Sequence, residues 1–352
     1  MAANLKVAVV GAGLMGRLVA LRLVQNGAKV SIYDQGDRLA HDSCSWTGAG
    51  MLSPYCELEH SESQIAQIGL RSMVLWPELL ASLPLPVSYW QEGTLAVAHA
   101  SDQPELEQLK QRVTQFTVQE KLSADADIMR LVAPGDIEPE LEDRFGEGLF
   151  FPKEGHVDNR ELLRGLEAAL AGCDWHMGNK VTELKALRGD HDWVVDCRGL
   201  GGGDPELRGV RGELIYLHAP EVNLSRPVRL MHPRYPIYIA PRNDSVFVVG
   251  ATQIESSDRG PIRVKSALEL LSAAYSLHPG FAEAEWIESS VNCRPAYPDN
   301  LPRICIDDNQ IMRINGLYRH GFLMGPALAE AACALLNREH PRPELEPIIH
   351  IT

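Results

Sequence analysis

Three glycines near the start of the chain have the spacing of a phosphate-binding turn. Gly11, Gly13 and Gly16 follow the apolar run 7–10, which has the length and composition of a buried strand. In such a turn, Gly11 permits the tight bend, Gly13 lets the backbone approach a pyrophosphate, and Gly16 lets a helix pack on the strand. The free N–H groups at the start of that helix would bind the phosphates. The spacing therefore predicts a dinucleotide-binding site.

A carboxylate lies where such a site needs one. The second predicted strand, residues 29–33, is followed by Asp34, eighteen residues after Gly16. A carboxylate here can accept hydrogen bonds from both hydroxyls of an adenosine ribose, and it repels a 2′-phosphate. Apolar residues at helical spacing over 14–24, with Gly27 just beyond, predict a helix between the two strands. The alternative is a glycine-rich turn in an ordinary α/β protein that binds no dinucleotide.

Length and charge limit the partners of this chain. Its 352 residues are enough for two domains with cores of their own. The 33 lysines and arginines against 47 aspartates and glutamates leave a net charge of −14, which argues against a nucleic-acid partner. No apolar run reaches the roughly 18 residues of a membrane helix. The start does not resemble a signal peptide, since Gly11 cuts its apolar segment short.

The cysteines and histidines predict neither disulfides nor a metal. The seven cysteines are an odd number, are scattered along the chain and form no C-x-x-C pair. Reduced thiols, and hence a cytoplasmic location, fit this usage best. The twelve histidines form no H-x-x-x-H pattern, and no Cys/His cluster has the spacing of a zinc site. We therefore expect no bound metal.

The elements that must position the glycine turn can be followed along the chain. Helical patterns cover 62–81 and 103–118, and 93–98 has the composition of a strand. Asp158 can cap a helix that runs to about Leu170, with Glu161 reaching back to complete a capping box.

A late strand joins the sheet of the glycine turn. Residues 193–196 form a strand that leads into the glycine turn 199–201, and we place this strand beside the first one. A return to the first sheet so late in the chain predicts a discontinuous domain.

The second half of the chain is predicted to be rich in β-structure. Residues 211–291 are mostly strands, the clearest being 246–252, interrupted by a helix over 265–277. A further strand is expected near 311–314. Pro326 is expected at the first position of a last helix that ends near Leu336.

Three features favour FAD over NAD. The glycine turn opens the chain, and a segment of small residues, 47–53, follows Asp34 closely. A second glycine turn, 319–325, begins a late helix. The N–H groups at that helix start could meet an oxygen of the flavin ring and stabilise negative charge there.

Several motifs in one order resemble those of a known family. They are residues 11–16, 45–54, 155–160, 195–201, 232–242, 250–252, 294–295 and 315–322. Together they span nearly the whole chain and resemble the D-amino-acid oxidase family of FAD enzymes, in particular the glycine oxidases of thiamine biosynthesis. The resemblance implies an α/β fold: a Rossmann-like FAD-binding domain built from discontinuous segments, and a substrate domain with a mostly antiparallel sheet. It assigns 1–85, 145–208 and 292–352 to the first domain, and 86–144 and 209–291 to the second.

The resemblance also implies the chemistry. Glycine, sarcosine, D-alanine or another small amino acid loses its α-hydrogen as hydride to the flavin. The imine hydrolyses to a 2-oxo acid and ammonia, or feeds thiazole synthesis, and O₂ is reduced to H₂O₂. A homo-oligomer is implied in the same way. Two alternatives remain open: a dehydrogenase that passes electrons to a quinone or a protein, and a flavoprotein that matures or regulates another protein.

Three residues are assigned to the substrate by the resemblance. Arg294 matches the arginine that binds the substrate carboxylate, for which a planar guanidinium is well suited. Tyr238 matches a tyrosine that donates its hydroxyl to the same carboxylate. Arg319 is expected to neutralise substrate or flavin charge. The alternatives are a surface arginine near a turn, a half-buried strand tyrosine and a salt bridge at a helix end.

A larger set of residues is expected to bind FAD. They are Gly11, Gly13, Leu14, Met15, Gly16, Asp34, Thr47, Gly48, Ala49, Gly50, Met51, Val181, Arg198, Gly199, His320, Gly321, Phe322 and Leu323.

The chain departs from the family pattern at several positions. Gln253 replaces an apolar residue that can line the pocket, which leaves the substrate open, and Cys293 is expected to be a small buried side chain. Related sarcosine oxidases attach flavin to a cysteine where this chain has the segment 296–297, so we expect FAD to be held without a covalent bond. Met51 and Tyr235 are expected to narrow the pocket.

Overall fold

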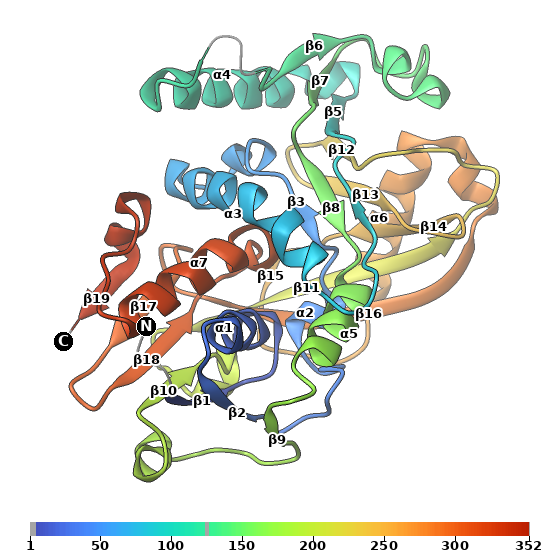
Figure 1. Cartoon of the computed structure of the whole chain (residues 1–352). Helices are drawn as coiled ribbons and strands as arrows, with labels where there is room; N and C mark the ends of the chain where they lie inside the picture. The colour runs from blue at the N-terminus through green and yellow to red at the C-terminus, as the bar shows by residue number, and fades with distance from the viewer. Residues whose placement is uncertain (1–4, 124–126, 352) are drawn as a thin grey trace.

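A mostly parallel sheet, in which β17 and β18 alone pair antiparallel within the described residues, carries the glycine turn. The structure, a computed structural model, describes residues 5–123 and 127–351. Its seven-stranded sheet has the order β19-β17-β18-β10-β1-β2-β9 (Figure 1). The strands are β1 (Lys6–Val10), β2 (Lys29–Tyr33), β9 (Asp174–His176), β10 (Trp193–Asp196), β17 (Arg303–Ile306), β18 (Ile311–Asn315) and β19 (Ile349–Ile351). Val9 pairs with Ile32 on one side and with Val195 on the other, both in parallel register, so the predicted late return to this sheet is confirmed.

A nine-stranded sheet is the second large sheet of the molecule. Its order is β15-β11-β14-β13-β12-β5-β7-β6, and β16 pairs with β11. The strands are β5 (Thr94–Ala98), β6 (Arg130–Val132), β7 (Gly148–Phe151), β11 (Arg208–His218), β12 (Val228–Met231), β13 (Ile237–Pro241), β14 (Val246–Gly250), β15 (Ile254–Glu255) and β16 (Glu285–Ala296). Most of its pairs are antiparallel, as expected for the substrate domain, whereas β12 and β5 run parallel. A small sheet joins β3 (Met51–Leu52), β4 (Tyr89–Trp90) and β8 (Gly155–Val157).

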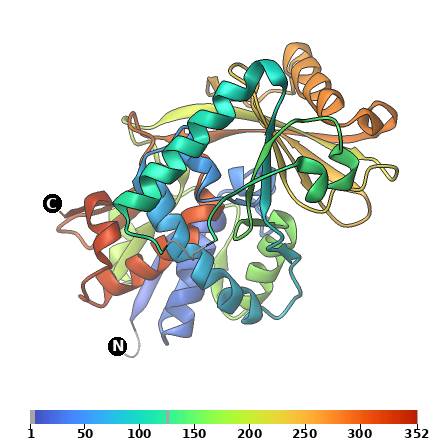
Figure 2. The same cartoon turned by 90° about the horizontal axis from the view of Figure 1, so that it is seen from above.

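The helices divide between the two large sheets. They are α1 (Leu14–Gln25), α2 (Cys44–Thr47), α3 (Ser63–Ala81), α4 (Gln103–Gln119), α5 (Asn159–Ala169), α6 (Val264–Leu277) and α7 (Gly321–Leu336). Helices α1, α3 and α7 pack together and share one apolar core with the seven-stranded sheet. Helix α6 packs on the nine-stranded sheet, far from α1 and α7 in both views, and α4 crosses the top of the molecule (Figures 1 and 2).

The predicted elements are largely confirmed, with two corrections in local detail. Helix α1 ends at Gln25, and Gly27 beyond it has a φ of +83°, as expected for a helix stop. Asp158 caps α5 by accepting hydrogen bonds from two backbone N–H groups, but Glu161 does not complete the box. Its carboxylate accepts a hydrogen bond from Ser88 N at 2.7 Å instead.

The start of the last helix is the second correction. Pro326 lies inside α7, not at its first position, because the helix already begins at Gly321. Met324 N donates to His320 O at 2.8 Å, so helical hydrogen bonding starts before the proline.

The division into two domains stays a prediction, and its limits at residues 1 and 352 lie outside the described residues. The pairing of the strands differs from the predicted domain boundaries in two places. Strand β7, within the predicted range 145–208, belongs to the nine-stranded sheet because Leu149 pairs with Ala96 of β5. The end of β16, within 292–352, pairs with β11 in the same sheet.

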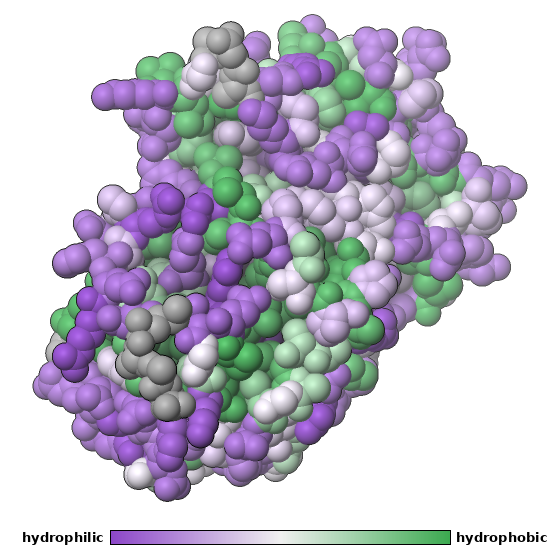
Figure 3. Space-filling view, viewed as in Figure 1, coloured by the Kyte–Doolittle hydropathy of each residue, from purple (hydrophilic) through white to green (hydrophobic). Residues whose placement is uncertain are grey.

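The surface seen in Figure 3 is largely hydrophilic, and the cysteines form no disulfide bond in the part of the chain that the structure describes. Hydrophilic side chains cover most of the face in Figure 3, with smaller apolar patches between them. Within residues 5–123 and 127–351, no helix is long and apolar enough to span a membrane. The seven cysteines are free thiols, and burial raises the pKa of the Cys56 and Cys197 thiols well above the ordinary value.

Candidate active site

A cavity of about 1730 Å³ is lined by both large sheets. The glycine turn of β1 and α1 contributes Gly11 and Gly13, and Asp34 follows from the end of β2. The nine-stranded sheet contributes Tyr238 and Arg294. These five predicted residues, three for the dinucleotide and two for the substrate, therefore line one continuous space.

The three glycines of the turn have different surroundings. A Cβ on Gly11, whose φ is +104°, would lie 2.6 Å from Cys197 C, and a Cβ on Gly16 would lie 1.9 Å from Gly11 O. These two glycines are required for packing of the chain on itself. At Gly13 the nearest atom to a Cβ would be Ser45 Oγ at 3.6 Å. Gly13 therefore leaves open room on the cavity side, where a pyrophosphate would lie.

The polar groups around this turn fit a dinucleotide. Leu14 N donates to Ser45 Oγ at 3.0 Å, while the next N–H groups of α1 have no helical partner. The Asp34 carboxylate accepts from Ala12 N at 2.6 Å and from Gly36 N at 2.7 Å. Each of its oxygens keeps a lone pair for a ribose hydroxyl. The residues present therefore suit FAD as the resident cofactor.

The side chain of Arg198, predicted to bind FAD, forms its hydrogen bonds with neighbouring protein groups. Its guanidinium forms two 2.8 Å hydrogen bonds with the Asp196 carboxylate, and it donates to Val181 O at 2.7 Å. Arg198 and Gly199 line the large cavity, whereas Val181 lines a small adjoining cavity of about 60 Å³.

The segment of small residues after α2 packs closely against two elements. A Cβ on Gly48 would lie 2.8 Å from the Phe322 ring, and a Cβ on Gly50, with a φ of +66°, would lie 2.0 Å from Val157 O. All of residues 47–51 line the cavity. Small side chains are therefore needed where this backbone passes between α7 and β8.

The start of α7 also faces the cavity. Because its helical hydrogen bonds begin with Met324 N, the N–H groups of Gly321 and Phe322 are among those that the helix leaves open. Gly321 and Phe322 line the cavity, whereas the predicted Gly16, His320 and Leu323 do not.

One face of the nine-stranded sheet carries the predicted substrate residues. Register places Leu214 beside Gly250 and Gly250 beside Tyr238, so their side-chain directions point to the same face. Two glycines make room on this face. A Cβ on Gly212 would lie 2.3 Å from Arg294 Nη2, and a Cβ on Gly250 would lie 2.8 Å from the Tyr238 hydroxyl.

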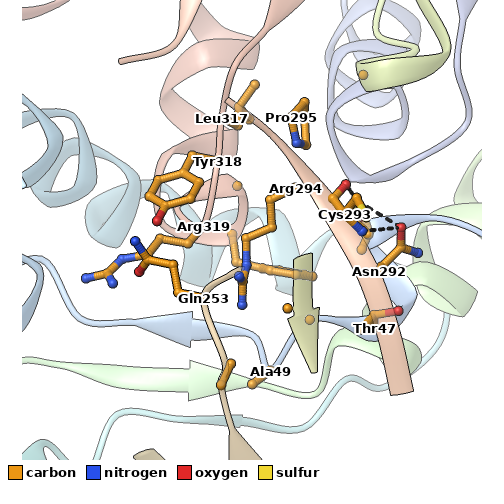
Figure 4. A pocket seen from close by; sticks show the side chains of 18 of the residues that line it. Thr47, Ala49, Gln253, Asn292, Cys293, Arg294, Pro295, Leu317, Tyr318 and Arg319 are labelled. Atoms are coloured by element: carbon orange, nitrogen blue, oxygen red, sulfur yellow. Dashed lines mark hydrogen bonds between the residues drawn. The ribbon is translucent and has the colours of Figure 1, made fainter. Parts of the chain in front are cut away.

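Arg294 has an unneutralised charge. It extends from β16 into the pocket beside the loop that carries Gln253 (Figure 4), and its Nη1 donates to Thr252 O at 3.1 Å. Within the described chain, no carboxylate forms an ion pair with Arg294. Burial raises the pKa of Tyr238, which keeps its hydroxyl protonated as a donor. The pair offers a cation and a hydrogen-bond donor to an anionic group.

Arg319 is neutralised, in line with the salt-bridge alternative. Its Nε donates to Glu57 Oε2 at 2.8 Å, from the short 3₁₀ helix η1 (Cys56–Glu59). Glu57 Oε1 also accepts from Arg229 Nη2 at 3.2 Å. Burial opposes the charge of Glu57, but Arg319, Arg229 and His320 outweigh it and hold the pKa of this carboxyl well below its ordinary value.

Sequence reasoning missed Glu57, Arg229 and Gly212. Arg229 could have been noticed, because an arginine in the apolar strand β12 needs a buried partner. Glu57 and Gly212 have no local signal. Met51 and Tyr235, which are expected to narrow the pocket, line the cavity, as does the exposed Gln253, and Cys293 is fully buried.

Comparisons with known proteins agree with this fold and cavity. The thiamine biosynthesis oxidoreductase ThiO of Rhizobium etli is 40% identical over 342 residues, which covers 97% of this chain and 99% of the relative. The glycine oxidase of Pseudomonas putida is 27% identical, covering 96% of this chain and 95% of that protein. The crystal structure of glycine oxidase from Geobacillus kaustophilus superposes with a TM-score of 0.85 at 22% identity, covering 98% of each chain.

The family model described as DAO, FAD dependent oxidoreductase, matches residues 6–335. A match of this length includes the glycine turn, the nine-stranded sheet and the start of α7. The chain is therefore an enzyme of the DAO family of FAD-dependent oxidoreductases, and its cofactor is FAD.

Proposed function

We propose that this enzyme oxidises glycine or another small amino acid or secondary amine, such as sarcosine or D-alanine. The imine product hydrolyses to a 2-oxo acid and ammonia (methylamine when the substrate is sarcosine), or passes into thiazole formation for thiamine. O₂ is the final acceptor and leaves as H₂O₂. The names of the ThiO and glycine oxidase relatives support this activity.

The observation that carries the proposal is the free charge of Arg294. Its guanidinium lies in the FAD cavity without an acidic partner in the described residues, held over Gly212 and bonded to Thr252 O. A guanidinium in this state is suited to bind a carboxylate through two parallel hydrogen bonds. Tyr238 lies on the same sheet face and supplies a hydroxyl donor.

The remaining roles follow from the cavity lining. When bound, FAD supplies the two-electron acceptor. Gly11, Gly13 and the start of α1 would hold its pyrophosphate, and Asp34 its ribose. The start of α7 would place N–H groups and a positive dipole end at the flavin ring, which favours negative charge there. Met51 and Tyr235 would narrow the space beside the substrate.

Absorbance of the purified enzyme tests the activity. Glycine, sarcosine and D-alanine are added in turn without O₂. At least one of them should reduce the flavin almost completely, which is seen as loss of its visible absorbance band. Air admitted afterwards should restore the band rapidly and produce H₂O₂. Bleaching with slow reoxidation would instead indicate a dehydrogenase with another acceptor, and no bleaching by any amine would contradict amine oxidation.

A variant pair tests the substrate site. Arg294→Ala should raise the KM for the substrate at least about thirtyfold, because a shielded charged hydrogen-bond pair contributes about 2 kcal/mol or more. Arg259→Ala is the matched control, since Arg259 lines the same cavity but is exposed. An unchanged KM in Arg294→Ala would remove Arg294 from this role.

A further inference from the structure

Three of the arginines that line the cavity fall into two classes by their acidic partners. Arg229 and Arg319 both contact Glu57, and Arg229 Nη2 also lies 3.9 Å from Glu59 Oε2, whereas Arg294 has no acidic partner in the described residues. Glu57 Oε2 lies 2.8 Å from Arg319 Nη2, and Oε1 lies 3.2 Å from Arg229 Nη2. All four side chains line the same space or its immediate wall.

Glu57 lies within electrostatic reach of the proposed substrate site. The charges of Arg294, Arg229 and Glu57 all act on the pKa of Tyr238, and those of Arg319, Arg294 and Glu57 act on the pKa of Tyr318. The Glu57 side chain is 12% exposed, and the Arg229 side chain 10%. In so shielded a place the charges are weakly screened by water, so their sum governs which ions can enter.

We propose that Glu57 determines specificity by neutralising Arg319 and Arg229, so that the site accepts substrates with one carboxylate and rejects those with two. This inference rests on the proposed function. With Glu57 in place, Arg294 is the one of these three arginines that is left to bind a carboxylate. A second carboxylate near Tyr238 would meet guanidinium groups already paired, and the negative charge of Glu57 itself.

Arg319 is the group that loss of Glu57 would release. Its side chain is 21% exposed, against 10% for Arg229, so Arg319 is the more accessible of the two paired arginines that line the cavity. Removing the Glu57 charge leaves Arg319 free to bind an anion. The same change removes a repulsive charge, so both effects favour a second carboxylate.

Binding of acetate and malonate to the FAD-loaded enzyme, measured by calorimetry, tests the proposal without turnover. Glu57→Gln should raise the affinity for malonate relative to acetate by about tenfold or more. Glu62→Gln is the matched control, since Glu62 lines the same cavity and its side chain caps no helix. The malonate-to-acetate affinity ratio of Glu62→Gln should stay within about twofold of the wild-type ratio, because this substitution frees no arginine from an ion pair.

Two further variants connect the effect to Arg319. The double variant Glu57→Gln/Arg319→Gln should return the malonate-to-acetate ratio most of the way to the wild-type value. Arg319→Gln alone should shift the ratio in the opposite direction, against malonate, and it tests the proposal even if Glu57→Gln folds poorly. An unchanged ratio in Glu57→Gln, or an equal shift in Glu62→Gln, would overturn the role of Glu57.

The outcome also separates this inference from the proposed function. If the wild type binds acetate and Arg294→Ala does not, the result supports a carboxylate site at Arg294, independently of the result for the Glu57 variants. If the wild type binds neither anion, the carboxylate site fails, and with it the role of Glu57. In turnover, Glu57→Gln should gain activity on iminodiacetate or D-aspartate relative to glycine.

Discussion

At the scale of single residues, the absence of a side chain shapes the site as much as the charged groups do. Gly212 leaves room for the Arg294 guanidinium, and Gly250 for the Tyr238 hydroxyl. Both glycines are in strands, where a glycine usually weakens the sheet and marks a place where another group approaches closely. Here the approaching groups are the two residues proposed to hold the substrate.

Gly212→Ala should therefore impair substrate binding while the fold is kept. The new Cβ would lie 2.3 Å from Arg294 Nη2, so the guanidinium has to move away from its position beside Thr252 O. We expect KM to rise about tenfold or more, since a displacement of about 1 Å can cost about a hundredfold in rate. Steady-state kinetics and a thermal melt measure the two effects.

Gly146→Ala is the control for that variant. A Cβ on Gly146 meets nothing within 4 Å, so KM and melting temperature should both stay close to the wild type. If Gly212→Ala keeps the wild-type KM, Arg294 does not hold the substrate from its observed position.

At the scale of elements, helix starts decide how the cavity is built. Helix α1 and helix α7 both begin at its wall, and α5 begins beside the segment 47–51 that lines it. The Asp158 cap was predictable, because an aspartate followed by a helical pattern is a local signal. The partner of Glu161 was not, because Ser88 N is distant in sequence.

Asp158→Ala should destabilise the protein by about 0.5–2 kcal/mol. The aspartate accepts 2.9 Å hydrogen bonds from Arg160 N and Glu161 N, and alanine leaves both donors without this partner. Urea unfolding at fixed FAD concentration measures the loss. Asp308→Ala, an exposed loop position, should change stability by less than about 0.5 kcal/mol. Equal losses in the two variants would show that the cap contributes nothing specific.

At the scale of the whole molecule, local patterns predicted the fold better than the site. The glycine turn, Asp34 and the strand 193–196 lie on one sheet as expected, because each has its own signal in sequence. The predicted position of Pro326 is wrong, because the prediction rested on the preference of proline for the first helical position, whereas α7 already begins at Gly321. The link from Glu57 to Arg229 and Arg319 spans 172 and 262 residues, so no local pattern could reveal it.

Acid precipitation of the enzyme should release unmodified FAD, so the yellow colour should stay in the supernatant and not in the protein pellet. Of the cysteines that line the cavity, Cys44 and Cys293 are hydrogen-bonded inside the protein, and Cys44 Sγ donates to Cys293 O at 2.9 Å. Tyr297 and Ala296 occupy the segment where related sarcosine oxidases attach their flavin. Mass spectrometry of the precipitate should give the mass of the unmodified chain. A yellow pellet with added flavin mass would contradict non-covalent binding.

The buried thiols have a consequence for the working life of the enzyme. Thiolates, not thiols, react with peroxide, and the most exposed and acidic cysteines are oxidised first. Burial raises the pKa of Cys44 to about 11 and that of Cys333 to about 12, so both stay protonated at neutral pH. The H₂O₂ proposed as a product would therefore meet thiols that react slowly with it, which would limit self-inactivation of the enzyme. Prolonged turnover should leave these sulfurs unoxidised in peptide maps.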